Sequence, residues 1–376
     1  MVKRILIDTI NKRLKESPKA IVLVGPRQTG KTTLLLNLIG EEKKTVILDG
    51  DNPQTTDALV SAGEEVLARI IGNKKIVFID EAQQIPTIGR TLKIITDKFP
   101  DVQLYVSGSS ALEINQQTQE PLTGRKWEFN LFPISWQEWV NHVGYLKAKE
   151  QLEDRLLFGS YPEVLNSPGL EKEVLTQLAS SYLFKDVLSL AGVRKPEVLE
   201  KLIKALAYQM GNEVSYNELA NLIQVDKNTI NNYIHLLEQT FVIFKLQPFS
   251  KNLRNEISTT RKIYFYDNGL RNALISDFSP LTYRRDKGAL WESFLLSERM
   301  KKNHYSERLV NTYFWRTKQG QEIDLIEESD GKIRAFEFKF ASRKKAKAPS
   351  AFTKAYPDAD FKEINGGNFD DFLLDN

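Results

Sequence analysis

The chain has 376 residues, 41% of them hydrophobic, and a formal net charge of +3. This length allows two or three domains with ample cores, and the apolar runs are too short to cross a bilayer, so no membrane partner is expected. Without cysteine there are no disulfides, thiolate zinc sites or cysteine nucleophiles, and the three histidines are scattered. The small positive charge permits nucleic-acid binding without arguing for it. The first residues lack the apolar segment of a signal peptide, so a cytoplasmic protein is expected.

A complete phosphate-binding loop lies between an apolar run at 21–24 and an amphipathic helix that opens at Lys31. Gly25 and Gly30 allow turns that a Cβ would block, so backbone N–H groups can point at phosphates. Lys31 can reach the β- and γ-phosphates, and the Thr32 hydroxyl can ligate Mg²⁺. A strand-to-helix turn that binds nothing is disfavoured because the whole motif is present in its required context. The predicted nucleotide ligands of the loop are Gly25, Pro26, Arg27, Gln28, Thr29, Gly30, Lys31, Thr32 and Thr33.

After the loop helix, the sequence predicts a buried strand at 45–49 and a helix over 56–72. Two further strands of this domain end at polar side chains. The apolar run at 76–79 ends in Asp80, which is suited to hold Mg²⁺, and Glu81, which is suited to act as general base. Alone, such an ending usually marks a strand that leaves for solvent. The strand at 102–106 ends at Ser107, either a hydroxyl that senses the γ-phosphate or a helix cap or turn. ATP is preferred to GTP because no guanine-reading Asn-Lys-x-Asp motif stands in the expected place.

Four segments of the first 140 residues carry a resemblance: GPRQTGKTT, FIDEAQ, SGSS and TGRKWEFNLFPISWQEW. Together they resemble the prokaryotic AAA-type ATPases whose C-terminal half is an uncharacterised, endonuclease-like domain. The resemblance implies that Arg125 is an arginine finger acting in trans, in the active site of a neighbouring subunit, and hence an at least transient homo-oligomer. A surface arginine paired with a local acid is the alternative.

The middle of the chain is predicted to be mostly helical. A Gly-Tyr-Pro-Glu-like turn at 159–163 interrupts the first part and is interpreted as structural. Three helices and a β-ribbon over 196–270 predict a winged helix-turn-helix, and Ser215 with Glu218 predicts a capping box. DNA binding and plain protein packing both remain open for this module, because few arginines lie on its third helix. The polar residues exposed on that helix are Lys227, Asn228, Asn231 and Asn232.

The C-terminal segment is predicted to hold one long helix followed by three strands. Asp324, Glu337 and Lys339 stand on neighbouring strands after Glu292 on the helix, an order that resembles the PD-(D/E)xK nuclease core. The resemblance implies that Asp324 and Glu337 bind Mg²⁺, that Lys339 positions or deprotonates water, and that Glu292 supports the metal. An amphipathic hairpin with Glu–Lys pairing on a solvated face is the alternative. A phosphate clamp is suggested by Arg343, Lys344, Lys345 and Lys347.

The expected fold class is therefore α/β, with five successive parts. They are a P-loop NTPase core of AAA type with a parallel sheet (1–132), a helical lid (133–195), a winged helix-turn-helix (196–270), a linker (271–287) and a restriction-endonuclease-like α/β domain (288–376). The first hypothesis is an ATPase whose nucleotide state controls a DNA-directed, Mg²⁺-dependent nuclease domain. The second is an ATP-dependent switch whose winged-helix and nuclease-like domains only bind a partner protein or DNA.

Overall fold

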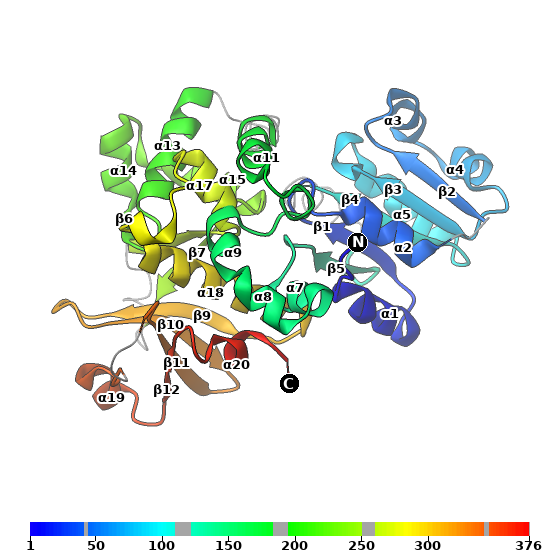
Figure 1. The fold of residues 1–376 in the computed structure, drawn as a ribbon. Coiled ribbons are helices and arrows are strands. Elements are labelled where there is room, and N and C mark those ends of the chain that lie inside the picture. Colours follow the sequence, from blue (N-terminus) through cyan, green and yellow to red (C-terminus); the bar gives the residue numbers. More distant parts are fainter. Residues whose placement is uncertain (41–43, 110–121, 183–194, 250–259, 342–345, 376) are drawn as a thin grey trace. The chain divides into compact units, whose positions relative to one another are not determined.

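The computed structural model describes residues 1–376 except 41–43, 110–121, 183–194, 250–259, 342–345 and 376 (Figure 1). The chain forms two compact units. The first, the nucleotide unit, comprises Arg4–Pro133 with Gln239–Phe241, and the second comprises Met1–Lys3, Ile134–Glu238 and Val242–Asn376. Over the ranges described, no helix is both long enough and apolar enough to cross a membrane.

The nucleotide unit is built on a sheet of five parallel strands in the order β2-β3-β4-β1-β5. Its strands are β1 (Ala20–Val24), β2 (Thr45–Asp49), β3 (Ile76–Asp80), β4 (Gln103–Gly108) and β5 (Lys126–Asn130). All five residues of β1 are apolar and buried, as expected for a central parallel strand covered on both faces. The helices are α1 (Leu6–Glu16), α2 (Lys31–Ile39), α3 (Pro53–Leu59), α4 (Glu64–Ile71) and α5 (Ile88–Lys98). The predicted parallel α/β sheet is confirmed.

One helix predicted over 56–72 is wrong as a single element. The backbone leaves the helix at Val60, which is extended, and Ser61 has a φ of +59°, in the left-handed region. Gly63 then caps the following helix, so α3 and α4 are separate. The apolar periodicity continued across the break, and only the backbone conformation ends the first helix.

Short helices begin the second unit: α7 (Trp136–Val143), α8 (Tyr145–Glu150), α9 (Leu152–Phe158), α10 (Pro162–Leu165), α11 (Glu171–Gln177) and the π-helix η2 (Leu178–Tyr182). The turn after α9 is structural. Gly159 has a φ of +68°, and a Cβ there would lie 1.9 Å from Asp267 Oδ1. The Ser160 N–H donates to the other carboxylate oxygen of Asp267 at 2.7 Å. This turn therefore holds a buried carboxylate that also caps α17.

Three helices and a β-ribbon follow: α13 (Pro196–Tyr208), α14 (Tyr216–Ile223), α15 (Lys227–Gln239), β7 (Ile243–Pro248) and β8 (Thr260–Phe265), with the short β6 (Glu213–Ser215) before α14. The predicted capping box is wrong, because the Ser215 side chain makes no capping hydrogen bond and its backbone pairs with Thr260. A capping box occurs instead at the start of α7. There the Ser135 hydroxyl accepts from the Glu138 N–H, and the Glu138 carboxylate accepts from the Ser135 N–H.

The C-terminal strands continue the sheet that the ribbon begins. The seven strands run in the order β12-β11-β10-β9-β7-β8-β6, and β7 pairs with β9 in parallel. The strands are β9 (Asn311–Arg316), β10 (Glu322–Ser329), β11 (Lys332–Phe338) and β12 (Asp360–Ile364). The helices are α17 (Asn268–Leu274), α18 (Lys287–Tyr305), α19 (Ser350–Ala355) and α20 (Phe369–Leu373), with the 3-10 turn η3 (Leu281–Tyr283). The ribbon and the C-terminal strands thus share one sheet.

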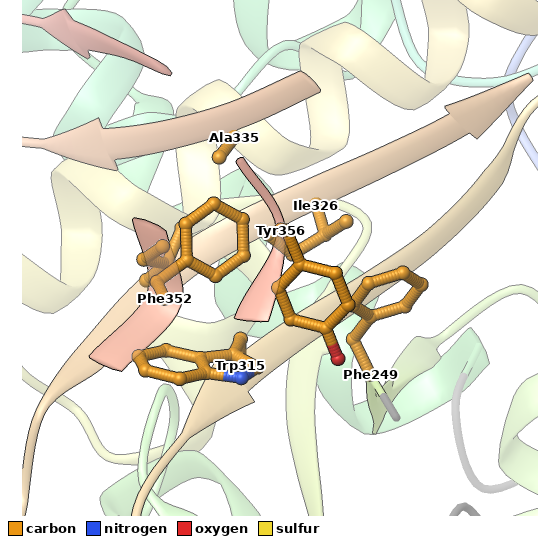
Figure 2. Packing of buried hydrophobic residues seen from close by; sticks show 7 residues of the cluster. Phe249, Trp315, Ile326, Ala335, Phe352 and Tyr356 are labelled. Carbon is orange, nitrogen blue, oxygen red and sulfur yellow. The ribbon is translucent and has the colours of Figure 1, made fainter. Parts of the chain in front are cut away.

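A buried apolar cluster covers one face of β9–β11 (Figure 2). Phe352 on α19 packs edge-to-face on Trp315, with ring centroids 5.2 Å apart. Ile323 and Ile326 both belong to this cluster although they are three residues apart, because β10 carries an irregularity between them. In a regular strand these positions would face opposite sides. Asp324 directly follows Ile323 and therefore faces away from the cluster.

Candidate functional site

The phosphate loop follows β1 and has the backbone that its glycines predict. Gly25 has a φ of +154°, and a Cβ there would lie 2.2 Å from the Leu131 carbonyl oxygen, so no larger residue fits. Gly30 has a φ of +90° at the start of α2. The Lys31 side chain is buried although it is a cation, and its Nζ donates to the carbonyls of Gly25 (3.0 Å) and Pro26 (2.9 Å). The loop therefore curls around a positive charge.

Asp80, at the end of β3, receives hydrogen bonds from two neighbouring elements. Thr32 Oγ1, on the first turn of α2, donates to Asp80 Oδ2 at 2.8 Å. Ser107 Oγ, on β4, donates to Asp80 Oδ1. Ser107 is fully buried inside β4, and its hydroxyl also accepts from the Glu81 N–H at 3.3 Å. The parallel order of β3, β4 and β1 brings these three residues to one edge of the sheet, where α/β proteins bind ligands.

These residues fit a magnesium ion. A hydroxyl and a carboxylate are hard oxygen donors, and Mg²⁺ in nucleotide sites takes only one or two protein ligands beside water and phosphate. Thr32 and Asp80 would hold it, and it would supply charge neutralisation at the phosphates. Within the described ranges, no group of three or more His, Cys, Asp or Glu side chains is arranged to hold a metal ion. The fit at Asp80 therefore depends on phosphate oxygens from the nucleotide.

Glu81 is held in place by a side chain that sequence reasoning did not single out. Its backbone is left-handed, with a φ of +45°, and its carboxylate accepts from Gln83 Nε2 at 2.5 Å. The same amide donates to Ser109 Oγ at 3.0 Å. Gln83 ends the segment FIDEAQ and Ser109 lies in the segment SGSS. These two segments were therefore the sequence signal that could have pointed to both residues. Gln83 and Ser109 fix the orientation of the expected general base.

Arg4 is a second contributor that sequence reasoning missed. Its buried guanidinium donates to the Thr29 carbonyl at 2.8 Å and to the Phe132 carbonyl at 2.6 Å. It therefore ties the phosphate loop to the chain that follows β5. Nothing in the local pattern around residue 4 indicates this role, because its partners lie 25 and 128 residues away.

Arg125 lies at the opposite edge of the sheet from the phosphate loop. Its carbonyl accepts from the Ala20 N–H at the start of β1, whereas the loop follows Val24. Five strand residues span about 16 Å. Its guanidinium pairs with Asp97, with Nε 2.5 Å from Oδ1, and is partly exposed. Arg125 is therefore remote from the nucleotide site of its own chain.

The second unit gathers an acidic cluster around a lysine from the ribbon. Lys262, on β8, has a side chain only 3% exposed, and its Nζ lies 3.2 Å from Glu292 Oε1 on α18. It also forms an ion pair with Glu322 on β10. The Tyr264 hydroxyl donates to Glu292, and Asp324 accepts from the Phe338 N–H at 2.7 Å.

The pKa values of these groups depend on one another's charges. Burial raises the pKa of Asp324 well above its ordinary value, and the charges of Glu292 and Glu337 raise it further. Burial likewise raises the pKa of Glu292. Burial alone would lower the pKa of Lys262, but the charges of Glu292, Glu322 and Asp324 outweigh it and raise that pKa. Lys262 is therefore a firmly charged ammonium among carboxylates.

The residues expected to hold a nuclease metal do not fit one in this arrangement. The Lys262 ammonium already bonds the carboxylate of Glu292, and Asp324 is paired with the Phe338 N–H. Glu337 pairs with Lys339, two residues further along the same segment, at 2.5 Å. This bond raises the pKa of Lys339 although burial would lower it. Of the expected phosphate clamp, Arg343, Lys344 and Lys345 lie outside the described residues.

The parallel sheet and phosphate loop define a P-loop nucleotide-binding domain. Comparison with known families agrees: residues 17–140 match an AAA domain. The rest of the chain matches two domains of unknown function, DUF8612 over residues 149–281 and DUF4143 over residues 287–368. The AAA-type P-loop core that the sequence predicts is thereby confirmed, and the winged-helix and nuclease-like interpretations stay predictions.

Similar proteins extend over most of the chain. An uncharacterised protein of Mycobacterium tuberculosis is 29% identical over 342 residues, covering 89% of this chain and 73% of its own length. One of Methanocaldococcus jannaschii is 22% identical over 370 residues, covering 92% and 81%.

Solved structures show only distant likeness. A signal transduction ATPase with a tetratricopeptide repeat sensor from Pyrococcus horikoshii is 12% identical with a TM-score of 0.30, covering 80% of this chain and 46% of its own. NtrX from Brucella abortus, solved in complex with ATP, is 11% identical with a TM-score of 0.28, covering 63% and 68%. Likeness at this level carries no argument about this chain.

Proposed function

We propose that this chain binds ATP with Mg²⁺ at residues 25–33, hydrolyses the ATP, and uses its nucleotide state to switch what the second unit binds. The arrangement of Lys31, Thr32, Asp80 and Ser107 at one sheet edge carries the proposal. The Lys31 ammonium donates to two backbone carbonyls, and the negatively charged oxygens of a phosphate are stronger acceptors for a cation.

Each side chain of this site has a role in the proposal. Lys31 and the amino end of α2 bind the phosphates. Glu81, oriented by Gln83, accepts the proton of the attacking water. Ser107 couples the presence of the γ-phosphate to Asp80, because its hydroxyl already donates a hydrogen bond to that carboxylate.

Removing the Lys31 amine tests the nucleotide site. Lys31→Ala is expected to lose ATP binding by calorimetry and to lose turnover by phosphate release, while circular dichroism stays unchanged. Lys98→Ala is the matched control, because Lys98 is an exposed lysine of the same unit. Unchanged hydrolysis in a folded Lys31→Ala protein would falsify the assignment of the loop.

Arg125 is proposed to act in trans, in the nucleotide site of a neighbouring copy. Its remoteness from its own loop supports this, and its bond to Asp97 has to break on assembly. Mixing Arg125→Ala chains with Glu81→Gln chains is expected to restore part of the turnover that each lacks alone. A fully active enzyme that stays monomeric at assay concentration contradicts this part of the proposal.

The second unit is proposed to bind a partner, DNA or protein, without cutting it. Lys262 inside the acidic cluster favours this over the nuclease alternative. DNA would meet the exposed polar face of α15, whose residues are Lys227, Asn228, Asn231 and Asn232. A plasmid-nicking assay with Mg²⁺, with and without ATP, is expected to show no cleavage. Cleavage by the wild type that Asp324→Asn abolishes would instead support the hypothesis of a Mg²⁺-dependent nuclease.

A further inference from the structure

The acidic cluster of the second unit is held together by side chains from three separate elements. Glu292 comes from α18, Glu322 and Asp324 come from β10, and Lys262 comes from β8 of the ribbon. The Lys262 side chain is 3% exposed, and its ammonium bonds both glutamates. The two glutamates are partly exposed, at 16% and 29%, so the lysine is the most deeply buried member of these two ion pairs.

This ammonium occupies the place that a divalent ion would need. A magnesium ion requires oxygen ligands, among them at least one or two carboxylates, to converge on one point at about 2.1 Å. Here the carboxylate oxygens of Glu292 and Glu322 converge on the Lys262 nitrogen instead. Asp324 Oδ2 accepts a hydrogen bond from the Phe338 N–H. Arg316, whose side chain is 42% exposed, lies 3.7 Å from Glu322, so a second positive charge stands near that carboxylate.

The irregularity in β10 is part of this arrangement. It lets Ile323 and Ile326 both fill the apolar cluster of Figure 2. Asp324 directly follows Ile323 and therefore faces the opposite side of the strand, where it interacts electrostatically with Lys262 and Glu292. β-Bulges commonly re-aim side chains in this way next to sites. Asp324 of β10 thus lies close enough to interact with Lys262 of the ribbon.

We infer that Lys262 is the permanent cation of this cluster, replacing the divalent metal that the PD-(D/E)xK-like order of residues implies. The second unit is then metal-free, and the ribbon is a component of its site. The inference concerns metal occupancy in the absence of nucleotide, so it stands or falls separately from ATP hydrolysis.

Manganese binding to the full-length, nucleotide-free chain tests this, with free Mn²⁺ counted by electron paramagnetic resonance. Wild type and Asp324→Asn are expected to bind the same number of ions. Lys262→Met, which keeps the length of the side chain and removes its charge, is expected to bind one ion more per chain. Adding Asp324→Asn to Lys262→Met is expected to remove that ion.

Two controls make the result specific to the position of the charge. Lys262→Arg keeps a cation and is expected to behave as wild type. Lys301→Met removes another buried lysine, paired with Glu298 at 2.6 Å outside the cluster, and is expected to add no ion. A wild-type ion that Asp324→Asn removes overturns the inference, and so does a folded Lys262→Met that gains none. If Lys262→Met fails to fold, the comparison of wild type with Asp324→Asn decides alone.

Discussion

The two units each place a half-buried acid near one end of a strand, and they satisfy it in opposite ways. Asp80 receives hydrogen bonds from the hydroxyls of Thr32 and Ser107. The cluster around Asp324 receives an ammonium, that of Lys262. Hydroxyls are neutral and can turn their lone pairs to a metal, whereas a lysine brings its own charge. The partner of an acid, more than the acid itself, decides whether a divalent ion can bind.

The two buried lysines show the same contrast from the side of the cation. Lys31 bonds two neutral carbonyls, at 2.9 and 3.0 Å, whereas Lys262 bonds carboxylates. Carbonyl oxygens carry only a partial negative charge, whereas carboxylate and phosphate oxygens carry a full one and attract an ammonium more strongly. An incoming phosphate would therefore compete well with the carbonyl partners of Lys31. It would compete poorly with the carboxylate partners of Lys262.

The largest effect is expected from removing the general base of the nucleotide unit. Glu81→Gln should lower turnover by roughly 10²–10⁴-fold, because an amide cannot accept the proton of water. ATP affinity, measured by calorimetry, should change little. Glu65→Gln, an exposed glutamate on α4, is the matched control. Turnover that survives Glu81→Gln would assign the base elsewhere.

The next effect concerns the arginine that braces the phosphate loop. Arg4→Met should lower the free energy of unfolding by about 2–3 kcal/mol, because two charge-assisted hydrogen bonds are lost and two buried carbonyls remain. It should also weaken ATP binding. Arg90→Met, an exposed arginine of the same unit, should stay near wild type in denaturant titrations. Equal stability of the two variants would show that Arg4 does not brace the loop.

A paired substitution compares the two acids directly. Asp80→Asn should weaken the Mg²⁺-dependent part of ATP affinity by roughly 10–100-fold, as loss of a ligand-orienting carboxylate does. Asp324→Asn should leave it unchanged. Calorimetric titrations with and without Mg²⁺ measure both. A Mg²⁺ effect of Asp324→Asn on ATP binding would contradict the separation of the two sites.

The smallest effect is expected from substituting Asp286, a carboxylate that accepts hydrogen bonds from two arginines. Burial alone would raise its pKa, but hydrogen bonds from Arg284 and Arg271 bring it down to about 2 from 3.8. Because the folded pKa is the lower one, this stabilisation is complete above about pH 4 and is lost as the pH falls through 2.

At pH 7, Asp286→Asn should therefore lower the free energy of unfolding by about 1–2 kcal/mol and flatten its pH dependence between pH 4 and 2. Urea unfolding at a series of pH values measures this. Asp277→Asn, a more exposed partner of Arg284, serves as the control. A pH dependence that Asp286→Asn leaves unchanged contradicts the assignment.

Much of the nucleotide unit could be predicted from the sequence because its signals are local. The loop Gly25–Thr32 has fixed spacing, and an apolar run ending in Asp80 and Glu81 follows it at a distance typical of a βα unit. The single helix over 56–72 and the capping box at Ser215 were predicted wrongly, because the backbone turns left-handed at Ser61 and Ser215 pairs with Thr260. Gln83 lay inside a recognised segment, but its contact with Glu81 depends on how the chain turns after β3.

By itself, the sequence determined the phosphate loop, the parallel sheet around it and the order of helices and strands, because hydrophobic period and glycine spacing act over a few residues. Only the tertiary structure decided what surrounds the acids. Lys262 meets carboxylates 30 and 60 residues further along the chain, through a sheet that joins the ribbon to the C-terminal strands. Charges interact through space, so their balance is fixed only when the chain has folded.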